Sequence, residues 1–172
     1  MASKTLRLSS IEAEHPLGPI LIASDNEMLV ALDFDSPEGR LRNSLQPRYG
    51  RDVIFAEGTC PAHIAVPIRA YLDGRLDALD HVPIDPGGTA FQQQVWAALR
   101  TIPAGATLSY GAMAARIGRP DAPRAVGSAN ALNPISIVVP CHRLVGSNGA
   151  LTGYGGGIRR KQWLLDHERG SG

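Results

Sequence analysis

The sequence predicts an α+β fold in two parts: a small N-terminal α/β domain at residues 1–82 and a mainly helical C-terminal domain at residues 89–172. Short apolar runs bounded by turn residues occur early in the chain, whereas helical spacing of apolar residues dominates later. Between them, residues 82–88 read Val-Pro-Ile-Asp-Pro-Gly-Gly, which cannot sustain regular structure. We therefore expect a linker at residues 83–88.

Composition indicates an ordinary globular protein. The 172 residues are 44% hydrophobic and carry a formal net charge of only +1, so any charged binding surface must be local. Cys60 and Cys141 are too few for a disulfide framework or a cysteine-rich zinc site. No run approaches the roughly 18 apolar residues of a membrane span. We expect a cytoplasmic monomer that does not associate with membranes.

The N-terminal part predicts a small sheet with one helix. Apolar runs at residues 20–23 and 28–34 flank the polar turn at residues 24–27, which is typical of a β-hairpin. Residues 52–56 predict a third strand. Residues 66–72 predict a helix that stops before Asp-Gly.

Three helices are predicted after the linker. Residues 89–92, Thr-Ala-Phe-Gln, fit a capping box that begins a helix of about ten residues. Ser109 can cap a second helix that Gly118 ends, and Pro120-Asp121 opens a third that reaches about Leu132. Two short helices across a tight turn resemble a helix-turn-helix.

The third helix is nearly free of bulky side chains and therefore can approach another surface closely. Its polar exceptions are Arg124 and Asn130. Two explanations stay open: tight packing on a neighbouring helix, or a surface that faces DNA. The small residues are Ala122, Ala125, Gly127, Ser128, Ala129 and Ala131.

Chemistry is indicated at Cys141. Residues 135–139 predict a buried strand that Pro140 stops, which would hold Cys141 rigidly at the strand's mouth. A thiol here is more often a packing residue than a nucleophile. His142, however, can accept the thiol proton and so convert a group of pKa near 8.5 to a thiolate. Because neighbours on an extended backbone point to opposite sides, a relay water is expected between them.

Residues 133–157, "NPISIVVPCHRLVGSNGALTGYGGG", closely resemble the active-site motif of the O6-alkylguanine-DNA alkyltransferases, in particular the bacterial Ogt-type proteins. The Pro-Cys-His-Arg core is highly specific to that family. The resemblance extends over about residues 89–168, through "FQQQVWAALRTIPAGATLSYGAMAARIG", "RAVGSANALNP" and "RRKQWLLDHE". The N-terminal part is compatible with the family's first domain, a variable α/β unit of ribonuclease-H-like form.

The resemblance implies direct reversal of DNA damage. The alkyl group of O6-alkylguanine, with O4-alkylthymine as a further candidate, would pass to Cys141 in a single turnover after the base is flipped out of double-stranded DNA bound through the minor groove. No metal and no cofactor are expected. His142 would act as the base through water, Glu168 would orient it, and Tyr110 would contact the flipped base and help to protonate the leaving purine.

The same resemblance implies the DNA-binding residues. Arg124 would enter the duplex in place of the extruded base, Asn133 would be the hinge between recognition helix and active-site strand, and Tyr154 would wall the pocket. Gly155 stands where some members carry serine, so a side-chain contact is lost there and a backbone N–H remains. The predicted DNA- and base-binding set is completed by Ala125, Gly127, Ser128, Asn130 and Arg143.

Elementary chemistry agrees with this assignment. Removal of an alkyl group from O6 requires in-line displacement at an sp³ carbon, for which a thiolate is the best side-chain nucleophile. The leaving purine carries developing negative charge that a hydroxyl or an N–H can stabilise. The target atom lies inside the base stack, so the base must be flipped out and the gap filled.

Two further motifs carry expectations. Arg159-Arg160-Lys161 places three cations at the start of a helix, where they oppose its dipole, which indicates an external anion such as phosphate. Asn148-Gly149 is a strong type I′ turn signal and predicts a hairpin-like wing at residues 144–152.

Three other functions agree less well with the sequence. A non-enzymatic lesion-binding protein of the alkyltransferase-like group would lack the acceptor thiol, which Cys141 supplies. A cysteine hydrolase would need an oxyanion hole, and adjacent Cys and His residues are poorly placed for direct pairing. A cofactor-dependent methyltransferase is disfavoured because no glycine-rich loop follows a strand in a βαβ unit.

Overall fold

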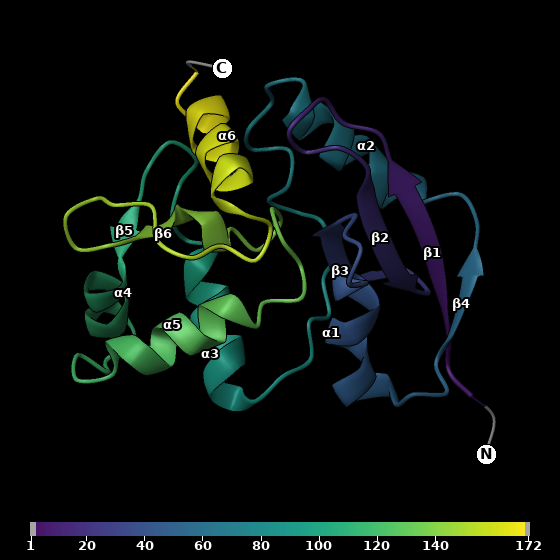
Figure 1. Ribbon diagram of the computed structural model, residues 1–172, viewed down its shortest axis with the longest axis horizontal. Helices are drawn as coiled ribbons and strands as arrows, with labels where there is room; N and C mark the ends of the chain where they lie inside the picture. Colours follow the sequence, from purple (N-terminus) through teal and green to yellow (C-terminus); the bar gives the residue numbers. More distant parts are fainter. Residues whose placement is uncertain (1–2, 171–172) are drawn as a thin grey trace. The chain divides into compact units, whose positions relative to one another are not determined.

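The computed structural model describes residues 3–170 and confirms the mixed α+β class. These residues form two compact units, divided between Gly87 and Gly88. The described chain contains six α-helices and a four-stranded sheet, with a further pair of short strands (Figure 1). None of its helices is long and apolar enough to cross a membrane.

Unit 1 is built on the four-stranded sheet. Its strands are β1 (Thr5–Ile11), β2 (Ile20–Asp25), β3 (Met28–Phe34) and β4 (Ile54–Glu57), in the order β3-β2-β1-β4. β2 pairs antiparallel with both β1 and β3, whereas β4 pairs parallel with β1. The hairpin predicted at residues 20–34 is therefore present, with Asn26 in the left-handed region at its turn (φ 55°).

Two helices complete unit 1. α1 (Arg40–Tyr49) packs on β3, and its sequence is so polar that no apolar period predicts it. α2 (Ala62–Leu72) begins at Ala62 rather than at residue 66, because Ile64 and Ala65 extend its buried face toward the N-terminus. β1 was also not predicted, although residues 5–8 alternate polar and apolar side chains. One buried cluster under α1 comprises Leu6, Ala23, Val30, Ala31, Leu41 and Leu45.

Unit 2 contains the predicted helical series. Its helices are α3 (Ala90–Leu99), α4 (Tyr110–Arg116), α5 (Pro123–Ala131) and α6 (Ile158–Glu168). The capping box of α3 is present: Thr89 Oγ1 accepts from the backbone N–H of Gln92 at 3.1 Å, and Thr89 N–H donates to Gln92 Oε1 at 2.9 Å. Ser109 caps α4 in the same way, accepting from Ala112 N–H at 3.0 Å.

α5 begins at Pro123 rather than at Pro120, because Pro123 occupies the first helical turn, where no N–H is needed. The indole N–H of Trp96 on α3 donates to the carbonyl of Ala129 at 2.8 Å and joins the two helices. Val126 and Ala129 face the interior, while Arg124, Ala125 and Ser128 are exposed. The small residues of α5 thus serve internal packing on one side and leave a smooth outer face on the other.

The strand predicted at residues 135–139 is wrong. The segment is a series of turns in which Val138 N–H donates to Ser136 O at 2.8 Å and Val139 N–H to Ile135 O at 3.0 Å. Ile137 has φ 70°, outside the range of any strand. A fully buried apolar run looks like a strand by composition, but here the turns keep its backbone groups paired. Cys141 and His142 therefore do not continue an extended strand, so their side chains need not point to opposite sides.

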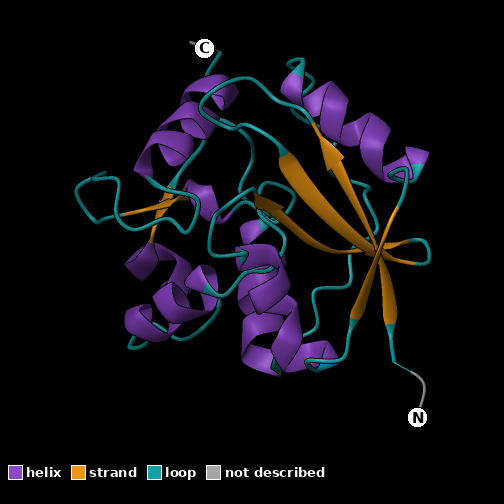
Figure 2. Ribbon diagram, turned by 45° about the vertical axis from the view of Figure 1, so that its right-hand side comes forward, coloured by secondary structure: helices purple, strands orange, loops and turns teal. Residues whose placement is uncertain are grey.

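The predicted type I′ turn is also wrong. Gly149 has φ 81°, but among the described non-glycine residues only Asn26 and Ile137 have positive φ, and a type I′ turn needs it at both central positions. β6 (Leu144–Val145) pairs in parallel with β5 (Leu108–Ser109) to form the small orange ribbon of unit 2 in Figure 2. The loop closes instead through Gly146 N–H and Ala150 O at 2.8 Å.

Candidate active site

Cys141 begins a 3₁₀ turn, η1 (Cys141–Arg143), that follows the turns of residues 135–139. Its side chain belongs to a residue only 6% exposed, so the thiol lies almost completely in the interior. Cys60, the other thiol of the described chain, belongs to unit 1, and burial raises its pKa. Cys141, unlike Cys60, is followed directly by a histidine that can act as a base, which makes it the chemical candidate.

His142 is completely buried and paired with Glu168 of α6. Its Nε2 lies 2.7 Å from Glu168 Oε2. An ionised carboxylate can only accept, so Nε2 carries the proton and donates it. Nδ1 of His142 is then the acceptor nitrogen, and it is buried without a hydrogen-bond partner in the described chain. The imidazole therefore keeps one basic nitrogen that could accept a proton.

The pKa values of this pair follow from burial and from its neighbours. Burial lowers the pKa of His142 below its usual range, and the positive charges of Arg143 and Lys161 add to that effect, while Glu168 opposes it. Burial alone would raise the pKa of Glu168, but the hydrogen bonds and charges of His142 and Arg143 hold it well below its usual range. The geometry therefore favours a neutral imidazole bonded to an ionised carboxylate.

Arg143 lies inside the protein. Its Nε donates to Glu168 Oε1 at 2.8 Å, its Nη2 donates to Glu168 Oε2 at 2.9 Å, and its Nη1 donates to Ile102 O at 2.5 Å. Only 8% of the residue is exposed. This bidentate pair fixes the Glu168 carboxylate, which in turn orients His142. A buried guanidinium that already donates to three oxygen atoms is not available to DNA. The expectation that Arg143 binds DNA or a base is therefore corrected.

Two asparagines hold the backbone around Cys141. Asn133 Nδ2 donates to Val139 O at 2.9 Å, and Asn133 Oδ1 accepts from Ile135 N–H at 3.0 Å, so its side chain closes the turns that precede the cysteine. Asn130, 6% exposed on α5, donates through Nδ2 to Cys141 O at 3.3 Å. Asn130 thus lies in the interior, bonded to the backbone of Cys141, rather than on an outer DNA-facing surface.

Tyr110 and the loop between β6 and α6 meet through one contact. The hydroxyl of Tyr110, the first residue of α4, lies 3.1 Å from Thr152 Oγ1. Tyr154 is half-buried on the same loop, and Gly155 is exposed. Thr152 did not feature among the predicted site residues, and nothing in its local sequence distinguishes it from an ordinary loop residue.

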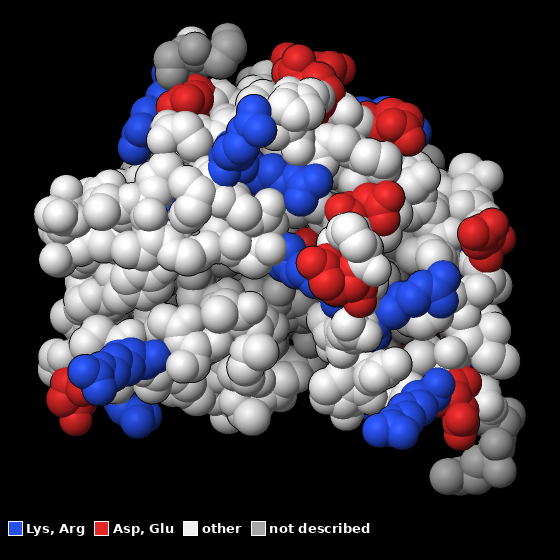
Figure 3. All heavy atoms as spheres, viewed as in Figure 1, with Lys and Arg blue, Asp and Glu red and all other residues white. Residues whose placement is uncertain are grey.

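Arg124 is exposed near the start of α5, with the exposed Ala125 and Ser128 on the same helix, and Gly127 is half-buried with Tyr110 beside it. A Cβ added at Gly127 would meet the Tyr110 ring at 3.7 Å. The face of unit 2 visible in Figure 3 is mostly uncharged over α5 and the loop that follows β6. A smooth outer helix face with one arginine is what the DNA-binding hypothesis requires.

The three cationic side chains at residues 159–161 differ in their exposure. Arg159 is exposed, and Arg160 donates to Gly156 O at 3.2 Å. Lys161 is fully buried and donates to two backbone carbonyls, which corrects its expected role at an external phosphate. The spacing of Lys161, Leu164, Leu165 and Glu168 is that of one helix face and could have revealed its burial.

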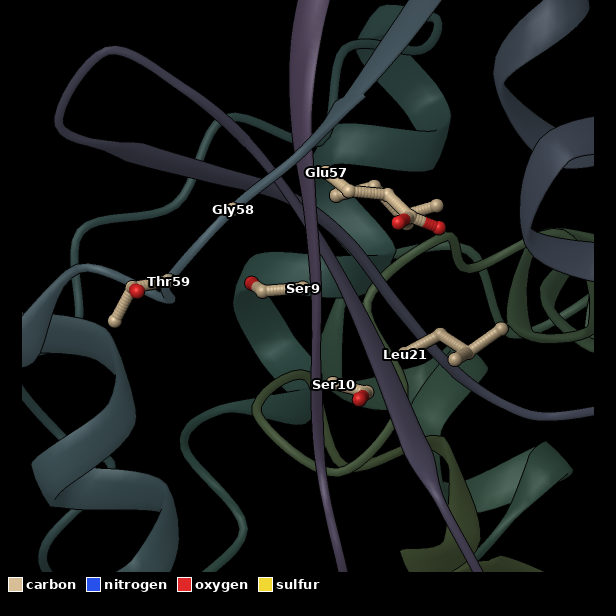
Figure 4. A pocket seen from close by; sticks show the side chains of 7 residues that line it. Ser9, Ser10, Leu21, Glu57, Gly58 and Thr59 are labelled. Atoms are coloured by element: carbon tan, nitrogen blue, oxygen red, sulfur yellow. The ribbon is translucent and has the colours of Figure 1, made fainter.

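A pocket in unit 1 involves none of these residues. Figure 4 shows Ser9 and Ser10 pointing to opposite sides of β1, with Glu57 extending from the end of β4. Among the described residues, no cluster of His, Cys, Asp and Glu is arranged to hold a metal ion. The pocket is lined by Leu8, Ser9, Ser10, Leu21, Glu57, Gly58 and Thr59.

Comparisons with known proteins agree with the geometry of unit 2. Residues 90–170 match the family model described as 6-O-methylguanine DNA methyltransferase, DNA binding domain. A "Methylated-DNA--protein-cysteine methyltransferase" of Shigella flexneri is 46% identical over 167 residues, covering 95% of this chain and 96% of that protein. A protein of the same name from Mycobacterium bovis is 58% identical over 156 residues, covering 91% of this chain and 89% of that protein.

Solved structures extend the similarity to both units. The crystal structure of Mycobacterium tuberculosis OGT in complex with DNA has a TM-score of 0.79 and 40% sequence identity, and the match covers 96% of this chain and 94% of that chain. The chain therefore belongs to the methylated-DNA–protein-cysteine methyltransferase family.

Proposed function

We propose that this protein repairs alkylated DNA by direct reversal, transferring the alkyl group of O6-alkylguanine in double-stranded DNA to Cys141. O4-alkylthymine is a second candidate substrate, because it presents the same kind of alkyl ether. One observation carries the proposal: a buried cysteine precedes a histidine whose Nε2 donates to a buried carboxylate, in a chain of this family.

Proton transfer comes first in the proposed reaction. Neutral His142 accepts the thiol proton at Nδ1 through a relay water, and Glu168 stabilises the imidazolium that forms. The relay is expected because Nδ1 is the unoccupied nitrogen, not because the backbone is extended. The thiolate then attacks the sp³ carbon in line. The C–S bond forms, the C–O6 bond breaks, and its electron pair passes to the purine.

The leaving purine needs a proton or a hydrogen bond. The contact of the Tyr110 hydroxyl with Thr152 Oγ1 supports Tyr110 as the donor, because Thr152 belongs to the loop that carries Tyr154 and Gly155. The backbone N–H of Gly155 is the second proposed donor. Proton donation from either group stabilises the anion that develops at O6.

DNA recognition is assigned to α4 and α5 as a helix-turn-helix, with α5 in the minor groove. The exposed Arg124 would fill the space left by the flipped base, while Ala125 and Ser128 let the helix backbone approach the groove. Gly127 lies beside the Tyr110 ring, where even an added Cβ would make only an ordinary van der Waals contact at 3.7 Å. Asn133 acts as the hinge that connects α5 with the turns before Cys141.

The finer architectural assignments belong to the same proposal. We assign unit 1 to the ribonuclease-H-like domain of the family and residues 144–152 to a wing, with residues 83–88 as the linker and residues 89–172 as the DNA-binding and transfer domain. The protein would act as a monomer in the compartment that holds the chromosome, in accord with the cytoplasmic location expected from the sequence.

Bond chemistry predicts that the reaction occurs once per molecule. A thioester has a carbonyl that water attacks, so cysteine hydrolases regenerate their thiol. S-alkylcysteine is a thioether without a carbonyl, and His142 and Glu168 have no route to reverse its formation. Cys141 would therefore stay alkylated after one reaction.

Limiting protein mixed with excess O6-methylguanine duplex tests this proposal. Repaired DNA should reach a plateau at one equivalent, intact mass should show one added methylene, and peptide mapping should assign it to the peptide that contains Cys141. Steady production of several equivalents, or a mass change at Cys60, would contradict it. A thioester substrate assayed in parallel should show no turnover, and sustained hydrolysis would instead indicate a cysteine hydrolase.

A further inference from the structure

Thr152, on the loop between β6 and α6, contacts the residue that is proposed to protonate the leaving purine. Its Oγ1 lies 3.1 Å from the hydroxyl oxygen of Tyr110. Thr152 is exposed and Tyr110 is partly exposed, so a hydrogen bond between their hydroxyls adds little to the stability of the fold. The contact is better explained by what the Thr152 hydroxyl does to Tyr110 during the reaction.

Two further contacts hold Thr152 in place. Its backbone carbonyl accepts from Lys161 Nζ at 3.1 Å, and the same ammonium donates to Leu144 O at 2.6 Å, at the start of β6. A Cβ added at Gly146 would lie 3.4 Å from Thr152 Cγ2, so the methyl group of Thr152 lies beside Gly146. A β-branched side chain has few allowed rotamers. With its methyl group at Gly146, Thr152 directs its hydroxyl to Tyr110.

Tyr110 is held from the other side. It directly follows β5, which pairs with β6 so that Ser109 lies opposite Val145. A Cβ added at Gly127 of α5 would lie 3.7 Å from the Tyr110 ring. β6 in turn directly follows the η1 turn that begins at Cys141. The backbones that carry Tyr110 and the nucleophile are therefore both anchored at β6.

The direction of the hydrogen bond follows from the role of Tyr110. A hydroxyl has one proton to donate and two lone pairs that accept. When Tyr110 gives its proton to the purine, its oxygen takes part in the contact with Thr152 only as the acceptor. We propose that Thr152 is a positioning residue that donates to the Tyr110 oxygen and thereby directs the Tyr110 proton to the leaving purine. This inference rests on the proposed alkyl transfer and deepens it.

The proton transfers balance with this assignment. As the C–O6 bond breaks, the Tyr110 proton passes to the purine and the phenol oxygen becomes negative. The Thr152 O–H stabilises that charge, because a hydrogen bond to an ionised oxygen is stronger than one between neutral groups. Thr152 keeps its own proton throughout. Tyr110 regains a proton from water, and water takes the proton that His142 accepted from the thiol.

A purely structural role for Thr152 has different consequences. A distorted loop would slow the reaction of the thiol with every reagent. Loss of a hydrogen bond to Tyr110, by contrast, would slow only those reactions whose leaving group needs a proton. Iodoacetamide alkylates a thiol and releases iodide, which needs none. A comparison of the two kinds of leaving group therefore separates the roles.

Variants in a Cys60→Ser background provide this comparison. Thr152→Val removes the hydroxyl and keeps the branched shape, Thr152→Ser retains the hydroxyl, and Thr101→Val removes an exposed hydroxyl elsewhere in unit 2. Intact mass follows the alkylation of Cys141 by a saturating O6-methylguanine duplex and, separately, by iodoacetamide. Tyr110→Phe and the double variant Tyr110→Phe/Thr152→Val complete a double-mutant cycle. Thr152→Ala replaces Thr152→Val if circular dichroism shows that the latter does not fold.

Thr152→Val should slow transfer from the duplex about tenfold, because a hydrogen bond to a developing charge is lost. Its rate with iodoacetamide should equal that of the parent, as should both rates of Thr152→Ser and Thr101→Val. In the Tyr110→Phe background, which should itself be slow, Thr152→Val should add nothing.

Four results would overturn the inference: equal slowing with both reagents, no slowing by Thr152→Val, a parent rate in Tyr110→Phe, or an undiminished effect of Thr152→Val in the Tyr110→Phe background. A parent protein that iodoacetamide alkylates but that takes no methyl group from the duplex would refute the proposed function, and this inference with it.

Discussion

Glu168 Oε2 lies 2.7 Å from His142 Nε2, and neither side chain has any exposed surface. The same carboxylate accepts two hydrogen bonds from Arg143. Glu168 therefore accepts hydrogen bonds from both His142 and Arg143 while it is completely buried. Changes at this carboxylate should affect stability as well as chemistry, because any partner left behind remains buried.

Glu168→Gln should destabilise the protein strongly. The amide is neutral and would leave the Arg143 guanidinium buried without an anion, which costs about 3–5 kcal/mol of unfolding free energy for a broken buried pair. Urea denaturation followed by circular dichroism measures this quantity. Asp166→Asn is the matched control, since Asp166 bonds Gln162 on the exposed side of α6 and its loss should cost no more than about 0.5 kcal/mol. Equal losses for the two variants would contradict the assigned role of the buried pair.

Stability should fall with acid in two windows. The pKa of His142 is lowered in the folded protein, so its contribution is fully present above the ordinary value near 6.5 and is lost as pH falls below it. The pKa of Glu168 is also lowered, so its contribution is present above about 4.3 and is lost at lower pH.

Denaturation at several pH values measures the upper window. Stability should fall as the pH falls below 6.5, with a slope of at most about 1.4 kcal/mol per pH unit, the value for one proton. His142→Gln should reduce that slope, since the variant has no imidazole to ionise. If wild type and His142→Gln lose stability in parallel over this range, His142 is not the group responsible.

Arg124→Ala should slow repair of duplex DNA far more than transfer from free O6-benzylguanine. Only the duplex requires stabilisation of an extrahelical base, a term of a few kcal/mol. Single-turnover rates on the two substrates give the comparison, and Arg75→Ala controls for loss of one exposed cation elsewhere. Equal slowing on both substrates would place Arg124 in the chemistry or in the fold.

Cys141→Ser should abolish transfer while retaining the fold and most of the affinity for DNA, because other residues make the proposed DNA contacts. Intact mass measures transfer, and fluorescence anisotropy with an alkylated duplex measures the affinity for DNA. Cys60→Ser should transfer one full equivalent. A Cys60→Ser protein without activity would contradict the assignment of Cys141 as the alkyl acceptor.

Local signals made much of unit 2 predictable. The capping residues Thr89 and Ser109 accept hydrogen bonds from N–H groups three positions ahead, so the neighbouring sequence alone predicts them. The pairing of His142 with Glu168, by contrast, spans 26 positions and was expected only because the motif resembles a family. Nothing in the spacing of the two residues would have placed them in contact.

The segment at residues 135–139 shows where local signals fail. Its composition is that of a buried strand, yet Asn133 binds the backbone at Ile135 and Val139, and these side-chain bonds close turns instead. The prediction for Lys161 was wrong for a different reason. A cation near the start of a helix is usually exposed, and the burial of Lys161 is explained only by the two backbone carbonyls that its ammonium binds. In both cases, contacts with residues outside the local sequence determine the structure.

The contact between His142 and α6 joins residues that are synthesised at different times. A chain is synthesised from its N-terminus, so Cys141 and His142 emerge from the ribosome before Glu168 does. Any translation product that ends between them contains the thiol but lacks the carboxylate that orients its base, and Arg143 in such a fragment has no anion to bind. The pairing of His142 with Glu168 is therefore complete only once α6 has been synthesised, and a prematurely terminated fragment would carry Cys141 without it.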